Sequence, residues 1–241
     1  LGGTVMMGGT TAFRTSYVNA ASGLAQSGGD ITVGVITGTG GVTKVGSNKL
    51  TVTGVYNGTG GWTVNQGTLE FSGAGKHKTG TAQTTVNGGP IVDGIPVNTL
   101  IYDNSLTAVS TRSATHPIVL NGGQFRLIGN SVTAVTEAMS GASLNFGSGY
   151  GLITLENKGA ALSVGTSSLA RTTGTGLIRG AGLGMATGTN NVFFNVTNYA
   201  TGTTGETFLG AGAQKLAAGI IPYVLVDTSE TGQGMSFATY N

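Results

Sequence analysis

The chain has 241 residues, of which 45 are glycine, 8 % are charged and none is cysteine. Its 11 basic and nine acidic residues are spread thinly and give a net charge of +2. This excludes the clustered basic surface of a nucleic-acid-binding protein. No stretch of about 18 apolar residues is present, so we expect no membrane span.

The composition is typical of β-structure. Valine and threonine suit strands, and glycine and asparagine suit tight turns. Glutamate, lysine, arginine and glutamine, which long helices usually contain, are scarce, and residues 211–218 form the only stretch of helical appearance. Since 39 % of the residues are hydrophobic and they alternate with polar ones, we predict an ordered all-β protein. Without cysteine, such a protein is held by packing and backbone hydrogen bonds.

In chain order, residues 1–40 are rich in glycine and threonine and alternate weakly. We interpret them as an N-terminal coil or a strand-donating segment, with residues 1–30 as the candidate donor. Residues 41–185 carry the clear repeats. Residues 186–241 form a C-terminal β region with apolar runs at 192–196 and 220–226, which we predict to be strands. We expect the chain to belong to a longer exported precursor.

The repeat consists of a small or polar residue, a glycine and an alternating apolar strand. Its copies begin at Asn65, Asn121, Ser140 and Lys158, with a weaker copy at Asn87. One inward column is predicted to contain Leu69, Phe125, Leu144 and Leu162. The next is predicted to contain Phe71, Leu127, Phe146 and Val164. We also expect asparagines at the turns to be left-handed and to form a ladder along the axis.

This pattern predicts a parallel β-helix, or β-solenoid, with turns rich in glycine and asparagine. Each coil cannot bury its apolar face alone and becomes stable between neighbours. A β-sandwich with glycine-rich hairpins is the alternative, because alternation alone does not separate the two folds.

One stretch resembles a known family. Residues 41–54 read GVTKVGSNKLTVTG and residues 56–71 read YNGTGGWTVNQGTLEF. This is similar to the autotransporter-associated β-strand repeat, although Trp62 replaces a common threonine and Tyr56-Asn57 inverts the usual order. The C-terminal part, from 221 to 240, resembles segments between repeat blocks in large secreted proteins of planctomycete- and verrucomicrobia-like bacteria. The resemblance implies a parallel β-helix and export.

No catalytic constellation is visible in the sequence. The nine acids are Asp30, Glu70, Asp93, Asp103, Glu137, Glu156, Glu206, Asp227 and Glu230. No two share a tight motif of the kind that glycoside hydrolysis or lyase chemistry needs, although stacking can bring distant residues together. The Gly-Gly pairs lack the aspartate of calcium-binding turns. No phosphate site is expected, because no helix follows the glycine-rich loops. We therefore assign no catalytic, cofactor or metal residue, and the ligand-binding residues stay unknown.

Several other residues have two interpretations. Lys76-His77-Lys78 could bind an acidic glycan but is better explained as a short protruding basic loop. His116, before Pro117, is interpreted as a turn residue, and two histidines give a weak metal signal. Tyr56 and Trp62 could form an exposed sugar-stacking platform, but inward packing is favoured. The sequons at Asn57 and Asn195 are chance-level matches.

We conclude from the sequence that the chain is an extracellular or cell-surface structural β-solenoid, a segment of a fibre or layer, and not an enzyme. An adhesin that binds a glycan or a surface is the alternative, followed by a polysaccharide-processing enzyme. End-to-end self-association is the expected partnership, because an uncapped solenoid end recruits another strand. Glycan or cell-surface contact is a further possibility, and no cofactor is expected.

Overall fold

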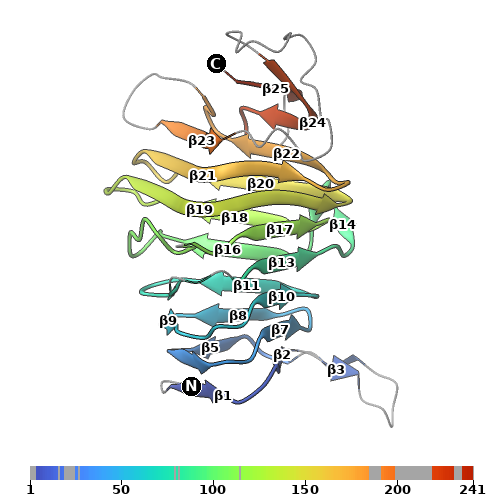
Figure 1. Ribbon diagram of the computed structural model, residues 1–241, viewed down its shortest axis with the longest axis vertical. Helices are drawn as coiled ribbons and strands as arrows, with labels where there is room; N and C mark the ends of the chain where they lie inside the picture. Colours follow the sequence, from blue (N-terminus) through green and yellow to red (C-terminus); the bar gives the residue numbers. More distant parts are fainter. Residues whose placement is uncertain are drawn as a thin grey trace.

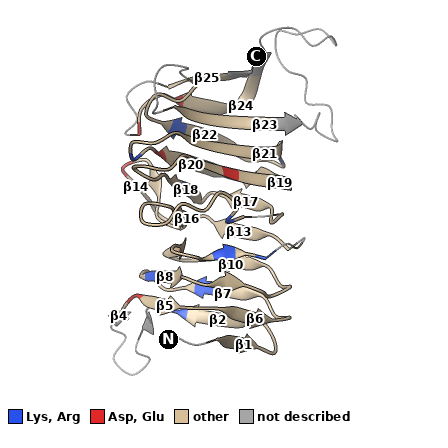
Figure 2. Cartoon of the chain, turned by 90° about the vertical axis from the view of Figure 1, so that its left-hand side faces the viewer, with Lys and Arg blue, Asp and Glu red and all other residues tan. Residues whose placement is uncertain are grey.

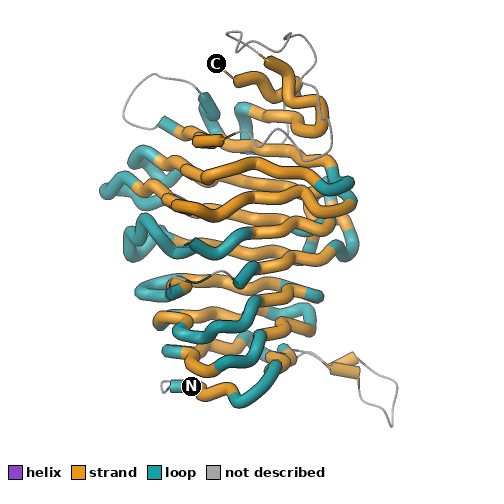
Figure 3. The backbone as a smooth tube through the Cα atoms, viewed as in Figure 1, coloured by secondary structure: helices purple, strands orange, loops and turns teal. Residues whose placement is uncertain are grey.

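The computed structural model describes residues 4–15, 17–18, 25–26, 28–78, 80, 82–113, 115–184, 191–198, 219–230 and 235–240. All regular structure in this part of the chain is β-strand, and it contains no helix (Figure 3). The prediction of an all-β protein is confirmed. The possible helix at 211–218 lies outside the described residues.

The strands form three large sheets and two small antiparallel pairs. The four-stranded sheet has the order β1 (Val5–Met7), β6 (Ile36–Gly38), β9 (Val55–Tyr56) and β12 (Lys76–His77). The eight-stranded sheet has the order β2 (Thr11–Arg14), β7 (Val42–Val45), β10 (Trp62–Val64), β13 (Thr84–Asn87), β17 (Ile118–Asn121), β19 (Val135–Ser148), β21 (Leu162–Arg171) and β23 (Val192–Asn198). The nine-stranded sheet has the order β25 (Met235–Tyr240), β24 (Gly219–Asp227), β22 (Thr175–Gly180), β20 (Tyr150–Glu156), β18 (Gln124–Ile128), β16 (Thr99–Asp103), β11 (Thr68–Phe71), β8 (Lys49–Val52) and β5 (Ile31–Val33). The small pairs are β3 (Tyr17–Val18) with β4 (Ala25–Gln26), and β14 (Ile91–Val92) with β15 (Ile95–Pro96).

The chain visits the large sheets in turn, and we call one such passage a circuit. Three circuits, β5–β6–β7, β8–β9–β10 and β11–β12–β13, use all three sheets and form the three-sheet region, residues 31–87. From β16 to β23 each circuit uses only the nine- and eight-stranded sheets, which defines the two-sheet region, residues 99–198. The circuits lie one above the other along the long axis of the molecule (Figure 1).

Pairing within the large sheets is parallel, except between β24 and β25. A β-sandwich is built from antiparallel strands. The parallel sheets therefore do not match the sandwich alternative. The predicted strands at 192–196 and 220–226 are confirmed as parts of β23 and β24.

The strands before and after residue 41 belong to the same sheets. β1 pairs with β6, β2 with β7 and β5 with β8. Within the described part of the chain, β1, β2 and β5 are the outermost strands at the N-terminal end of the three sheets. This end therefore presents the edges of all three large sheets together.

The predicted inward columns are partly correct. Leu69 and Phe125 share one column with Leu100 between them, and both are fully buried. Leu144 and Leu162 are also buried but lie in the eight-stranded sheet, paired with Leu169 and Val135 respectively. Placing them in the same column as Leu69 was wrong, because alternation shows which side chains face inward but not which sheet a strand joins. The same split separates Phe146 and Val164 from the column of Phe71 and Leu127.

The turns after the eight-stranded sheet contain the predicted asparagine ladder. Asn87 Nδ2 donates to Asn65 Oδ1 at 2.7 Å, and Asn121 Nδ2 donates to Asn87 Oδ1 at 3.2 Å. The expected left-handed conformation belongs to glycine instead, since Gly67 has φ +72° and Gly122 has φ +86°. Asparagine supplies the side-chain ladder here, and glycine supplies the backbone reversal.

Candidate functional site

The two regions meet at a junction above β12, the last strand of the four-stranded sheet. There the amide of His77 donates to the carbonyl of Arg112 at 2.7 Å, and the amide of Ala138 donates to the carbonyl of Ser110 at 2.9 Å. The segment 104–117 thus lies between β12 and the first half of β19. We call this place the junction.

His77 lies in β12 and points into the molecule. It is 1 % exposed, whereas Lys78 is exposed. The interpretation of Lys76-His77-Lys78 as a protruding basic loop was wrong, because the three residues follow strand alternation and the central one faces inward. The alternative role, binding an acidic glycan, cannot involve the buried imidazole.

The two histidines of the chain meet at the junction. The rings of His77 and His116 stack with centroids 4.3 Å apart and planes inclined by 27°. His116 also lies in the predicted turn, where its amide donates to the carbonyl of Ser113 at 2.9 Å. The sequence contained no signal for this pairing, because the two residues are distant in the chain and the contact depends on how the circuits stack.

Aromatic rings surround His77 on its other sides. The ring centroids of Tyr56, Trp62, Phe71 and Tyr102 lie 5.8, 6.3, 4.5 and 6.3 Å from that of His77. Tyr56 and Trp62 are fully buried. The favoured inward packing of these two residues is confirmed, and the exposed sugar-stacking platform is wrong.

The histidine pair has no hydrogen-bonded partner. All four ring nitrogens of His77 and His116, together with Trp62 Nε1, are buried and make no hydrogen bond within the described part of the molecule. Burial lowers the pKa of His77 well below its usual value, and repulsion from His116 lowers it further. Burial alone lowers the pKa of His116. Both imidazoles are therefore neutral at neutral pH.

A buried carboxylate lies at the other side of the junction. Glu137, in β19, accepts hydrogen bonds from the amides of Arg112 at 3.0 Å and Ser113 at 2.7 Å. Burial raises its pKa to about 7, although these amides and the Arg112 guanidinium oppose the rise. The carboxylate therefore supplies acceptors to the 112–113 backbone where the regular ladder is interrupted.

Arg112 fixes the segment 104–117 to both regions. Its guanidinium is fully buried and donates to five oxygens on three sections of the chain. These are the carbonyls of Gly73, Gly75, Asp103 and Thr107 and the side-chain oxygen of Asn104. An arginine can satisfy so many acceptors because its planar fork carries five N–H groups.

The chemistry available at the junction is limited. The stacked imidazoles face each other and do not converge on a common point, and no three His, Cys, Asp or Glu side chains gather anywhere in the described residues. Glu137 is occupied by backbone amides. Within the described residues the junction therefore holds two neutral imidazoles, a carboxylate bound by backbone amides and a buried guanidinium, and none of them leaves the open position that a catalytic metal or nucleophile requires.

Apart from Asp93, which lies in the turn between β14 and β15, the remaining described acids make ion pairs or accept hydrogen bonds. Glu70 pairs with Lys49 at 3.0 Å, and Glu156 pairs with Arg126 and Lys158. Four other carboxylates accept a hydrogen bond from a backbone amide: Asp30 from Lys49, Asp103 from Ser105, Asp227 from Ser229, and Glu230 from Asn157. Strand register places no two of the described acids opposite each other. Glu206 lies outside the described residues.

Charged residues are sparse and are spread over the eight- and nine-stranded sheets. Figure 2 shows isolated charged positions on an otherwise uncharged chain. On the outer side of the nine-stranded sheet a polar row links Thr99 to Gln124 at 3.3 Å, Gln124 to Thr154 at 2.9 Å, and Arg179 to Thr154 at 3.0 Å. These side chains are hydrogen-bonded to one another along the sheet.

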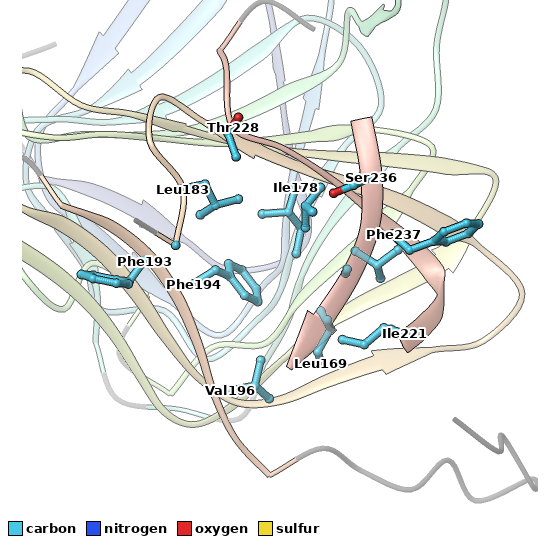
Figure 4. Close-up of a pocket in the computed structure, with 14 residues that line it drawn as sticks. Leu169, Ile178, Leu183, Phe193, Phe194, Val196, Ile221, Thr228, Ser236 and Phe237 are labelled. Atoms are coloured by element: carbon cyan, nitrogen blue, oxygen red, sulfur yellow. The ribbon is translucent and has the colours of Figure 1, made fainter. Parts of the chain in front are cut away.

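An apolar cavity lies near the C-terminal end of the stack. It has a volume of about 390 Å³ and is bounded by β21 to β25 (Figure 4). Its walls include Leu169, Ile178, Phe194, Ile221 and Phe237. No titratable side chain is among its described walls. The cavity could admit an apolar group but supplies no acid–base chemistry.

Comparison with protein-family models, with curated proteins and with solved structures gives no match. The resemblance to the autotransporter-associated repeat therefore remains a prediction from residues 41–71. The described residues also include no helix long and apolar enough to cross a membrane.

Proposed function

We propose that the chain is a segment of an extracellular or cell-surface β-solenoid whose function is structural and not enzymatic. The observation that carries the proposal is the continuous parallel pairing of the nine-stranded sheet from β5 to β24. Its inward column of Leu50, Leu69, Leu100 and Phe125 is fully buried. Stacked circuits of this kind make a rod, because each one covers the apolar face of the next.

Self-association is proposed to occur through the N-terminal edges of the sheets. The amides of Thr11 and Thr15 donate to the carbonyls of Gly41 and Val45, toward β7. In a parallel strand alternate residues face opposite neighbours, so Ala12 directs its amide away from β7. Met6 has the same relation to β6, because the amide of Val5 donates to Val35. An edge of this kind pairs with a strand of another copy.

Electron microscopy of the purified chain at neutral pH, without added ligand, tests this proposal. We expect filaments with an axial repeat. The double variant Met6→Pro/Ala12→Pro removes two outward donors while keeping the bonds to β6 and β7, and should abolish the filaments. The control Ala12→Val keeps the donor and should assemble. Dispersed wild-type particles, or filaments that persist in the proline variant, would refute association through this edge.

An adhesin is the second candidate. The hairpin β14–β15 carries Ile91 and Val92, which are more than half exposed, on a turn formed by Asp93 and Gly94. Exposed apolar side chains on a projecting hairpin are typical of contact surfaces. Binding of the chain to immobilised glycans or cells, lost on changing Ile91→Ser and Val92→Ser, would favour this role over a purely structural one.

A further inference from the structure

We propose that the junction is an acid-sensitive joint: protonation of the His77–His116 pair releases the segment 104–117 from β12, while the sheets on either side stay paired. The proposal concerns a property of the fold and does not depend on the structural or adhesive role.

The histidine stack is one of the contacts between the segment and β12. His116 is held in its turn by two bonds with Ser113, from the His116 amide at 2.9 Å and from Ser113 Oγ to the His116 carbonyl at 2.6 Å. Beside the stack, the amide of His77 reaches Arg112. A charge on either ring would lie 4.3 Å from the other ring in a largely aromatic enclosure. Burial of an unpaired charge is costly, so the open form gains population.

The neighbouring groups do not neutralise an imidazolium. Burial raises the pKa of both Tyr56 and Tyr102, so these rings stay uncharged. The carboxylate of Glu137 already accepts two backbone amides. Arg112 adds a positive charge at the junction, and the flanking lysines of β12 add two more. Among the described residues, the stacked pair therefore has no counter-ion on any side that packs against it.

The direction of the pH effect follows from linkage. A histidine whose folded-state pKa is lowered binds its proton less readily when closed than when open. Opening therefore becomes easier as the pH falls below about 6.5, by up to about tenfold per pH unit for each histidine. Both pKa values are lowered in the closed form.

Glu137 acts in the opposite direction. Its pKa of about 7 exceeds the ordinary 4.5, so the closed form binds this proton more tightly and acid makes opening harder. At pH 4.5 the histidines favour opening by up to about 10,000-fold and Glu137 opposes it by about 100-fold, so the net effect is at most about 100-fold. Without the histidines, the pH dependence of opening should reverse in sign.

Hydrogen exchange and tryptophan fluorescence test the joint directly. Trp62 is the only tryptophan of the chain and lies 6.3 Å from His77. Between pH 7.5 and 4.5 we expect exchange in 104–117, corrected for its intrinsic pH dependence, to accelerate by up to about 100-fold. The emission of Trp62 should shift to the red, while exchange in β18 and β20 stays unchanged.

The matched variant is His77→Phe/His116→Phe, which keeps two aromatic rings and removes both titrations. Exchange in its 104–117 segment should slow or stay constant on acidification. If wild type shows no acceleration, if the variant shows the same acid transition, or if β18 and β20 open together with the segment, the proposal is wrong.

A second measurement needs no variant. The chain has two histidines, so its NMR spectrum has two imidazole C2–H signals. We expect neither to titrate near pH 6.5 and both to change together with the opening of 104–117. A simple titration of either signal near 6.5, with the rest of the native spectrum unchanged, would show that the closed junction tolerates the charge and would overturn the proposal.

Discussion

The three-sheet and two-sheet regions use the same kind of pairing but fill their interiors differently. In the three-sheet region the strands have two to four residues, and Tyr56, Trp62, Phe71 and His77 meet in the interior. In the two-sheet region β19 has 14 residues and β21 has 10, and most of the buried side chains are aliphatic. We interpret the rings as filling the space that a third wall encloses.

Where the number of sheets changes, backbone pairing alone no longer satisfies every group. The second half of β19 pairs with β17 of the eight-stranded sheet, and its first half contacts the segment 104–117. Between the two halves the register shifts, from Met139 to Ser143, and Gly141 is left-handed with φ +75°. The polar side chains of Arg112 and Glu137 complete the missing bonds. The change of cross-section is therefore accompanied by a buried guanidinium and a buried carboxylate.

The largest expected effect comes from removing that charge. Arg112→Ala should lower the free energy of unfolding by about 3–5 kcal/mol, because five buried or partly buried oxygens lose their donor and Glu137 loses a nearby cation. Arg126→Ala is the matched control in the two-sheet region. Its ion pair with Glu156 is partly exposed, so about 1 kcal/mol or less is expected. Urea unfolding measures both, and equal losses would contradict the special role of the junction.

A second comparison concerns two left-handed glycines. Gly67, in the three-sheet region, has φ +72°, and a Cβ there would lie 2.4 Å from the carbonyl oxygen of Gly46. Gly94, in the hairpin between the regions, has φ +76° and no atom within 4 Å of the Cβ position. Gly67→Ala should cost about 3 kcal/mol and Gly94→Ala about 1 kcal/mol. Both variants introduce the strain of a positive φ, but only Gly67→Ala also introduces a clash between stacked circuits. The difference between their thermal unfolding temperatures therefore measures the contribution of the clash.

The asparagine ladder should contribute less. Asn87→Ala removes the bonds to Asn65 and Asn121 and should cost about 1 kcal/mol, because these amides are only partly buried. Asn195→Ala, at an exposed position of β23 in the two-sheet region, should change stability by less than about 0.5 kcal/mol. If Asn87→Ala lowers the free energy of unfolding by no more than Asn195→Ala, the side-chain ladder does not stabilise the turns, and their backbone hydrogen bonds alone hold them.

A pH dependence is expected from the three-sheet region. Lys44 Nζ lies inside, bonded to Thr15 Oγ1 at 3.0 Å and to the carbonyls of Gly46 at 2.6 Å and Gln66 at 2.9 Å. Burial lowers its pKa to about 8, against an opposing effect of Asp30. Between pH 8 and 10.5 the unfolded chain holds this proton and the folded chain does not. Wild type should therefore gain stability relative to Lys44→Met as the pH rises through this range.

Urea midpoints of the two proteins, measured at several pH values, check this sign. A midpoint difference that is constant with pH, or one that moves against the wild type, would contradict the lowered pKa of Lys44.

Local pattern was sufficient to predict much of the fold. Alternation identified Leu69, Phe71 and Phe125 as inward residues, and the repeat of asparagine at the strand ends predicted the ladder of Asn65 and Asn121. Such features depend on side chains two residues apart or on equivalent turns, both of which are visible in one sequence.

The features that failed depend on long-range placement. Leu144 and Leu162 have the same alternation as Leu69, yet they join another sheet because the circuits lose their third strand after β12. Likewise, His77 and His116 meet only because 104–117 takes the place of a strand above β12. The local sequence around either histidine contains no information about the other.

Engineered disulfides can test the parallel stacking and its register, because the chain has no cysteine of its own. Thr63 and Thr85 are neighbours in β10 and β13, whereas Val119 lies one strand further, opposite Thr85. Adjacent parallel strands lie about 4.8 Å apart, which is within the Cα–Cα distance that a disulfide can span. Two strands separated by a third lie too far apart for a disulfide. Thr63→Cys/Thr85→Cys should therefore oxidise to an intramolecular disulfide, seen by intact mass and non-reducing electrophoresis. Thr63→Cys/Val119→Cys should stay reduced under the same conditions, and the opposite pattern would contradict the stacked parallel order.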